Sequence, residues 1–198
     1  INDEVGLLVQ GFDGPARMLM NYAPPWYADA LENHGYRKAK DLLAYRIDGA
    51  APLPDAAGRL AHHAADTPGI VERPMDPSNF RAELQTVVDI FNDAWANNWG
   101  FVPMTAAEAG QLADNLKPLM RPGLIRFVER DGEPAAMIVA LPDLHEAIAD
   151  LNGRLLPFGW AKLAYRLKAN KVRGARILLM GVRKAHRTGF MGSAIAAL

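Results

Sequence analysis

The sequence predicts an α/β fold in which a mixed, mainly antiparallel sheet is flanked by helices. Apolar residues recur at three- and four-residue steps from Phe80 to Trp95, the pattern of an amphipathic helix. Two apolar runs flank Asp131-Gly132, a dipeptide that favours the tight turn of a β-hairpin. A last apolar run, 176–182, leads into a basic turn that contains glycine. Helix, hairpin and final strand together indicate helices packed on a sheet.

The first part of the chain is expected to hold short elements. A helix over 26–33 follows two prolines and ends at His34-Gly35. Residues 42–47 have the apolar content of a strand. Residues 49–78 mix Ala, Pro, Gly and Asp, so we interpret them as a connector in which 55–65 can form a helix.

The later elements follow one another with short connections. Thr105 and Glu108 have the spacing of a capping box, which predicts a second helix that ends near Leu119. The hairpin strands are predicted at 124–130 and 134–141. Two amphipathic helices are predicted at 144–152 and 158–171, and the final strand at 176–182.

Basic residues are concentrated at the C-terminal end. Residues 151–198 contain ten Lys and Arg and no Asp or Glu. The whole chain has a net charge of zero, so residues 1–150 hold the other 12 basic residues and all 22 acidic ones. The run from Arg183 to Ser193 contains Gly189 and Gly192 and precedes a small-residue helix start. Glycines let backbone N–H groups approach a phosphate, and the positive end of a helix favours an anion. The pattern therefore predicts a site for an anionic ligand such as a diphosphate.

The composition narrows the class of protein. The 198 residues are 50% hydrophobic and include no cysteine, which excludes disulfides, zinc ribbons and a thiol nucleophile. His62-His63 have no carboxylate or third histidine at ligand spacing, so we expect no metal site. No apolar stretch approaches the roughly 18 residues of a spanning helix, and no signal peptide is recognisable. We expect a cytoplasmic protein.

Several runs resemble one known family. They are residues 2–13, 91–103, 141–143 and 180–183. The chain resembles bacterial two-repeat GNAT-like acyl-CoA N-acyltransferases, and bacterial ceramide synthases are similar GNAT-like proteins. The resemblance covers nearly the whole chain.

The resemblance implies a division into two repeats. Residues 1–48 would be the C-terminal part of a first GNAT-like repeat and 49–78 the connector. Residues 79–198 would be the N-terminal part of a second repeat, with a helical insertion over 143–173. Because 4–12 already has the apolar content of a buried segment and the chain ends within a predicted helix, we expect a fragment of a longer protein.

The resemblance also implies that the basic turn binds the diphosphate of coenzyme A. In the family this turn reads Arg or Gln, two residues, Gly, one residue, and Gly or Ala. With Arg187 first, Phe190 replaces the first glycine; a shift by one residue uses Gly189 but places Met191 at the second small position. One bulky residue remains in either register. The alternative is that the glycines only allow close helix packing.

The acyl-CoA-binding residues expected on this basis lie on the last strand and in the turn. Backbone amides of the strand would hold the pantetheine and polarise the thioester carbonyl. The candidates are Met180, Val182, Arg183, Arg187, Thr188, Gly189, Gly192 and Ser193.

An amine acceptor must lose a proton, and the sequence offers several bases. Glu108, Asp143 and His145 are the catalytic candidates, with Glu146 next to them in the chain. A structural histidine and a turn-forming aspartate are the alternatives.

Aromatic residues suggest where a substrate is held. Asn98, Trp99 and Phe101 lie in the loop between two helices, where GNAT proteins commonly line the acceptor site. The alternative is that the two rings fix the loop to the core. Trp160 lies in a basic, apolar helix of the insertion, a pattern suited to a membrane surface or a long-chain substrate. The alternative there is a core-packing helix whose cations extend to solvent.

These observations converge on one function and leave one alternative. We expect an acyl-CoA-dependent N-acyltransferase acting on an amine such as a sphingoid base, located in the cytoplasm and in contact with the inner membrane if the insertion binds lipid. The alternative is an inactive GNAT-like binding or assembly module. Unpaired sheet edges in a fragment suggest a homodimer. The cations lack the base-stacking pattern of common nucleic-acid modules, so no nucleic-acid partner is expected.

Overall fold

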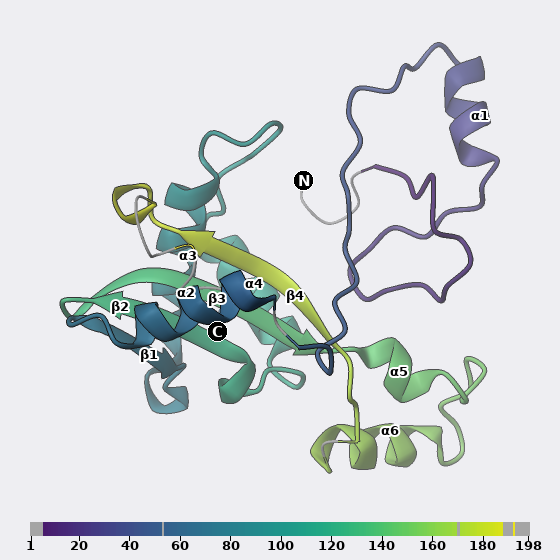
Figure 1. The fold of residues 1–198 in the computed structure, drawn as a ribbon. Coiled ribbons are helices and arrows are strands. Elements are labelled where there is room, and N and C mark those ends of the chain that lie inside the picture. Colours follow the sequence, from purple (N-terminus) through teal and green to yellow (C-terminus); the bar gives the residue numbers. More distant parts are fainter. Residues whose placement is uncertain (1–5, 53, 170, 188–191, 193–198) are drawn as a thin grey trace.

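A computed structural model describes residues 6–52, 54–169, 171–187 and 192. The four strands form one sheet in the order β1-β2-β3-β4, in which every pairing is antiparallel (Figure 1). The strands are β1 (Ile70–Pro74), β2 (Ile125–Arg130), β3 (Glu133–Pro142) and β4 (Ala175–Val182). The helices are α1 (Tyr27–Asn33), α2 (Asp55–Ala65), α3 (Phe80–Trp95), α4 (Ala106–Leu116), α5 (Leu144–Ile148) and α6 (Gly159–Lys168).

Two local sequence signals form as predicted. Asp131 and Gly132 have φ angles of 54° and 84°, so both central residues of the β2–β3 turn adopt the positive φ that this two-residue hairpin requires. The capping box is complete: the Thr105 side chain accepts from the Glu108 N–H, and the Glu108 carboxylate accepts from the Thr105 N–H at 2.9 Å. The predicted hairpin and the start of α4 are therefore confirmed.

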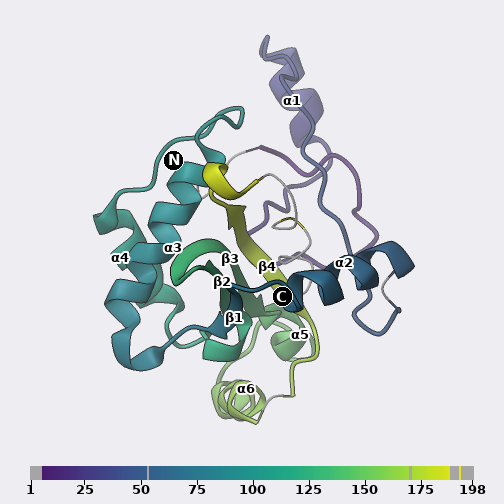
Figure 2. The same ribbon diagram turned by 60° about the vertical axis from the view of Figure 1, so that its left-hand side comes forward.

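Helices cover both faces of the sheet (Figure 2). The α3–α4 layer covers the face that holds the main core. This core consists of Met75, Val87, Ile90, Phe91, Ile125, Phe127, Met137 and Val139. On the other face Ala64 of α2 packs against Val128, Ala135 and Ala136, and these small side chains let the helix approach the strands closely. The α/β class with an antiparallel sheet is confirmed.

The end of α3 lies against β4 because the strand has a glycine at the crossing point. A Cβ built on Gly181 would lie 2.9 Å from the Cβ of Ala94 and 3.6 Å from the Cγ2 of Ile90. The only side chain that fits between these two elements without a shift is therefore a hydrogen atom. This contact sets the position of the last turn of α3 relative to the sheet.

A charged network joins β1, α3 and β2. Arg73 bonds to the carboxylates of Glu83 at 2.8 Å and Glu129 at 2.5 Å, and its guanidinium lies 4.7 Å from the centre of the Phe127 ring. The hydrogen bond to Glu83 raises the pKa of Arg73, so the guanidinium stays charged. Glu83 is buried, and this pairing satisfies its carboxylate.

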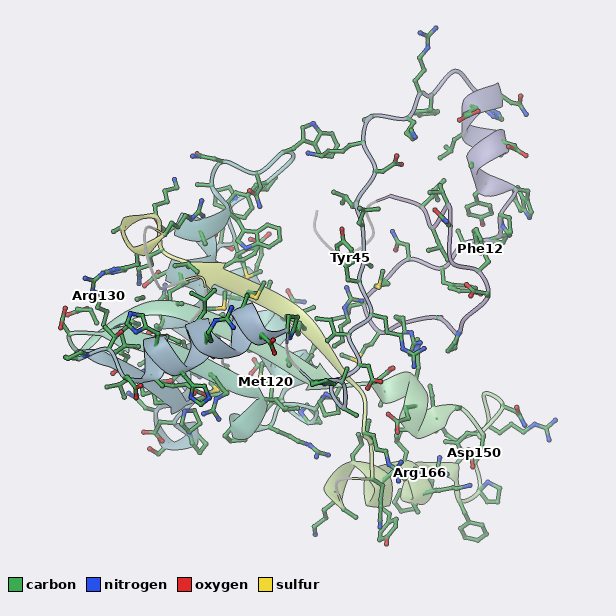
Figure 3. The ribbon with its side chains drawn as sticks, viewed as in Figure 1. Phe12, Tyr45, Met120, Arg130, Asp150 and Arg166 are labelled. Atoms are coloured by element: carbon green, nitrogen blue, oxygen red, sulfur yellow. The ribbon has the colours of Figure 1, made fainter. Side chains whose placement is uncertain are left out.

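Two expectations for the first part of the chain are wrong. Residues 42–47 form no strand, and the side chains of Leu42, Leu43, Tyr45 and Ile47 are 75% to 81% exposed. Figure 3 shows Tyr45 on a segment that stands away from the sheet. The described part of the 4–12 segment is likewise irregular, and Val9 is 60% exposed. A strand requires a neighbour for its backbone groups, and apolar content alone does not supply one.

The region interpreted as a connector contains an element that the sequence did not reveal. Helix α2 forms over 55–65 as expected, but β1 follows it and pairs with β2, for example Glu72 with Val128. Its five residues, Ile-Val-Glu-Arg-Pro, include two charges and a proline. Position at the edge of the sheet explains this composition, because an edge strand tolerates a proline and faces solvent on one side.

We predict that Gly181→Ala lowers the free energy of unfolding by about 1–3 kcal/mol, because the added methyl group overpacks the contact with Ala94. Thermal and urea denaturation followed by circular dichroism measure the change. Gly110→Ala in α4 is the matched control, since nothing from another element lies within 4 Å of its added Cβ. The control should stabilise by roughly 0.5–1 kcal/mol. Equal effects of the two substitutions would contradict the packing argument.

Candidate functional site

A hollow of about 430 Å³ lies where α3, the loop after it, β4 and the basic turn meet. Five of the predicted site residues line it. They are Asn98, Met180, Val182, Arg187 and Gly192. Ala94, Trp95 and Gly181 complete the lining. The structure thus brings together most of the described residues that were predicted from the sequence to bind the donor or the acceptor. Asn98 and Gly192, which both line the hollow, are almost 100 positions apart in the chain.

The edge of β4 supplies backbone groups to this hollow. Within the described residues no strand pairs with the outer side of β4. The Arg183 N–H donates to the Ala135 carbonyl at 2.9 Å, which directs residues 181 and 183 toward β3. In an antiparallel ladder the alternate residues point the other way, so the N–H and C=O groups of Met180 and Val182 face the open edge.

The two outward carbonyl groups already have donors. The Trp95 Nε1–H donates to the Met180 carbonyl at 2.9 Å, and the Arg187 Nε–H donates to the Val182 carbonyl at 3.3 Å. The N–H groups of Met180 and Val182 on the same edge consequently remain as donors that face the hollow side of β4. Hydrogen-bond donors in a row suit a carbonyl or amide ligand laid along the strand.

The basic turn is held against the end of α3 by two contacts. The Lys184 N–H donates to the Asp93 carboxylate at 2.7 Å, and the Arg187 guanidinium bonds to the Ala94 carbonyl. The last carbonyls of a helix carry partial negative charge, and the Arg187 cation compensates it. Arg187 therefore places a positive charge on the wall of the hollow, anchored from two sides.

Arg183 has a different position from the one expected. Its Nε–H donates to the Pro134 carbonyl at 2.8 Å, and its N–H bonds to the residue after that proline. The side chain therefore fixes β4 to the irregular start of β3 and does not line the hollow. Thr188, Gly189 and Ser193, also predicted to bind the donor, lie outside the described residues.

Trp95 is a site residue that the sequence did not reveal. Its ring lies 5.6 Å from that of Phe91, centre to centre, and its Nε1–H holds the β4 carbonyl described above. The helical pattern counted Trp95 among the core-facing residues, but the side chain is 37% exposed at the end of α3. A tryptophan at the last position of an apolar helix face, next to a polar loop, is the signal that could have identified it.

The two aromatic residues of the loop after α3, Trp99 and Phe101, have different surroundings. Phe101 packs on Phe91 with the ring centres 5.3 Å apart, so it fixes the loop to the core as the structural alternative proposed. Trp99 is 64% exposed and lies under the Lys40 ammonium at 5.8 Å. Only Asn98 of the three lines the hollow.

Asp143 and His145 lie at the opposite end of β4. Pro142 pairs with Ala175, the first residue of β4, whereas the hollow begins at Met180. Five strand residues span about 17 Å, so neither candidate base reaches the hollow by its side chain. The structure therefore does not bring these two residues together with the predicted donor site.

Both residues instead attach the N-terminal segment to the sheet. Asp143 is buried and accepts from the Arg17 guanidinium at 2.9 Å, and the His145 ring bonds to the Ala16 carbonyl. Arg176 bonds to the Met18 carbonyl; burial lowers the pKa of Arg176, and the nearby Asp143 acts in the opposite direction. Asp143 also caps α5 by accepting from the His145 N–H.

The remaining candidates lie elsewhere. Hydrogen bonds from Thr105 in the capping box lower the pKa of Glu108, which makes its carboxylate a weaker base. Trp160 lies on α6, near the same end of the sheet as α5, and its Nε1–H donates to the Pro157 carbonyl at 3.0 Å (Figure 1). Neither residue lines the hollow.

No helix in the described part of the chain combines the length and the apolar content needed to cross a bilayer. No three His, Asp and Glu side chains of that part lie close enough together to hold a metal ion.

Comparison with known proteins supports one expectation from the sequence. No protein-family model matches the chain. It is 49% identical over 192 residues to a protein named bacterial ceramide synthase from Caulobacter vibrioides (strain NA1000 / CB15N), covering 97% of this chain and 50% of that protein. The chain is similar to ceramide synthases. It is also 44% identical over 201 residues to Protein YghO of Escherichia coli (strain K12), covering 100% of this chain and 50% of that protein.

The chain spans about half the length of the curated relatives it matches. The predicted similarity to ceramide synthases is confirmed, whereas the GNAT-like organisation in two repeats and its boundaries stay predictions.

We predict that Asp143→Asn loosens the N-terminal segment, because it removes the negative partner of Arg17. Trypsin cleavage after Arg17 should become about fivefold faster, as expected from the loss of roughly 1 kcal/mol of local stability. Asp41→Asn is the control, since Asp41 bonds at 2.9 Å to Lys38 and both side chains are exposed. Loss of activity with unchanged cleavage after Arg17 would contradict the attachment role and favour a catalytic one.

Proposed function

We propose that the full-length protein is an N-acyltransferase that moves an acyl group from a coenzyme A thioester to the amine of a long-chain base. The hollow beside β4 carries this proposal, because it combines an anchored cation with outward backbone donors. Its volume of about 430 Å³ falls within the range of small-molecule sites. The name of the Caulobacter relative, bacterial ceramide synthase, supports the acceptor class.

The donor would lie along the edge of β4. An extended pantetheine carries amide groups that can bond to strand backbone, as an added strand does. Arg187 would then meet the diphosphate, and the small residue Gly192 also lines the hollow. Phosphate oxygens form strong charge-assisted hydrogen bonds with a guanidinium, which provides both charge and orientation.

The reaction needs little from the protein beyond positioning and charge stabilisation. The amine nitrogen attacks the thioester carbonyl carbon, and the carbonyl oxygen becomes an oxyanion. An outward N–H of Met180 or Val182 would stabilise this oxyanion. Collapse of the intermediate breaks the carbon–sulfur bond, expels the thiolate of coenzyme A and leaves an amide after the nitrogen loses its proton.

The identity of the proton acceptor distinguishes an active acyltransferase from a module that only binds acyl-CoA. Asp143 and His145 hold the N-terminal segment, and Glu108 is engaged in a capping box. The proposed reaction therefore assigns the proton of the amine to water or to a base other than these three residues. The same observation favours the second candidate function, a GNAT-like module that binds acyl-CoA without turning it over.

We predict that Arg187→Glu weakens the binding of palmitoyl-CoA to the full-length protein by about 10- to 100-fold, because each hydrogen bond to a charged group contributes roughly 1.5–3 kcal/mol. Isothermal titration calorimetry measures the affinity. Arg81→Glu, an exposed reversal on α3, is the control and should bind like the wild type. Wild-type protein that binds no acyl-CoA would refute the proposed donor site.

Turnover distinguishes the two functions. Full-length wild type incubated with palmitoyl-CoA and sphinganine should release free thiol, and a shorter amine panel should release less. Thiol release that requires sphinganine supports the transferase. Tight binding of acyl-CoA without release in the presence of any amine supports the binding module instead.

A further inference from the structure

The α5–α6 unit projects from the end of the sheet opposite the hollow (Figure 1). Its outer surface carries large apolar side chains that face solvent. They are Leu155, Leu156, Phe158, Trp160 and Tyr165, which are 48%, 80%, 77%, 58% and 62% exposed. No residue of α6 is buried. Within the described residues α6 therefore contributes no fully buried side chain, and the core-packing alternative from the sequence is not supported.

Ion pairs turn the aromatic face of α6 outward. Lys162 and Arg166 both bond to the Asp150 carboxylate after α5, with the Arg166 Nη2 at 2.9 Å (Figure 3). The half-buried Leu163 and Leu167 lie on the side of the helix next to these cations. With 100° per residue, the side of α6 opposite Arg166 runs from Trp160 through Lys168 to Tyr165, and all three side chains are exposed.

A hydrogen bond fixes the orientation of Trp160 on this surface. The Trp160 Nε1–H donates to the Pro157 carbonyl at 3.0 Å, which ties the indole to the turn that carries Leu156 and Phe158. An indole with one polar contact and an apolar body suits the boundary between water and hydrocarbon.

Three exposed cations lie in the same stretch of chain as these apolar residues. Arg154, Lys168 and Lys171 are exposed, and within the part of the chain that the structure describes none of them forms a salt bridge. No Asp or Glu occurs anywhere in 151–198, so no acidic residue of this region neutralises them. We name the five apolar residues and these three cations the α6 patch.

We propose that the α6 patch docks the protein on an anionic membrane surface. Exposed Trp, Phe and Leu next to unpaired Lys and Arg match the two layers of such a surface, acyl chains below and negative headgroups above. A second copy fits less well, because a symmetric contact through the patch would bring its cations together. The proposal does not depend on the chemistry of the hollow at the other end of β4.

The test is flotation of the full-length protein with vesicles, without substrate. Vesicles of equal parts phosphatidylglycerol and phosphatidylcholine should bind the wild type, and added salt or pure phosphatidylcholine should weaken binding. Lys168→Glu with Lys171→Glu should weaken partition to the anionic vesicles at least about 30-fold, since each cation contributes about a factor of five. Phe158→Ala with Trp160→Ala should weaken it about tenfold or more.

Matched controls keep the test specific to the patch. Arg59→Glu with Arg81→Glu changes the net charge equally on the exposed sides of α2 and α3. Trp26→Ala with Tyr36→Ala removes aromatic residues that are 62% and 67% exposed elsewhere. Both controls should partition like the wild type. The proposal is overturned if wild type does not float with anionic vesicles, if the controls lose as much binding as the patch variants, or if light scattering shows that the patch variants lose dimerisation instead.

Discussion

The close approach of α3 to β4 at Gly181 is the constraint on which the candidate site depends. Without a Cβ at this position, Ala94 lies directly against the strand. The last turn of the helix is then near enough for Trp95 to bond to the β4 edge and for Arg187 to bond to the end of the helix. The hollow lies between these contacts, and Ala94, Trp95 and Arg187 all line it.

The two ends of β4 have separate roles. At the C-terminal end, the Asp93 carboxylate and the carbonyls of Ala94 and Val182 hold the described part of the basic turn beside the hollow. At the N-terminal end, Asp143 and Arg176 hold the segment around Met18, which packs on Leu141. The α5–α6 unit extends from the same end. The proposed donor site and the proposed docking surface therefore lie at opposite ends of β4, each with its own cations.

Local patterns in the sequence were sufficient for most of the regular elements. The spacing of apolar residues gave α3, and the reciprocal bonds of Thr105 and Glu108 gave the start of α4. These signals work because the interacting residues are three or four positions apart. β1 was missed and the strand over 42–47 was wrong for the opposite reason, since pairing with a distant strand decides both.

By itself, the sequence determined the acid-free basic end, the helix–hairpin–strand order and the small residues of the turn, all of which depend on local chemistry. Only the tertiary structure decided which residues share a site. It brought Asn98, Met180 and Arg187 together, turned Arg183 toward β3, and assigned Asp143 and His145 to an attachment point. The physical reason is that strand register and helix packing, which join residues far apart in the chain, determine side-chain neighbours.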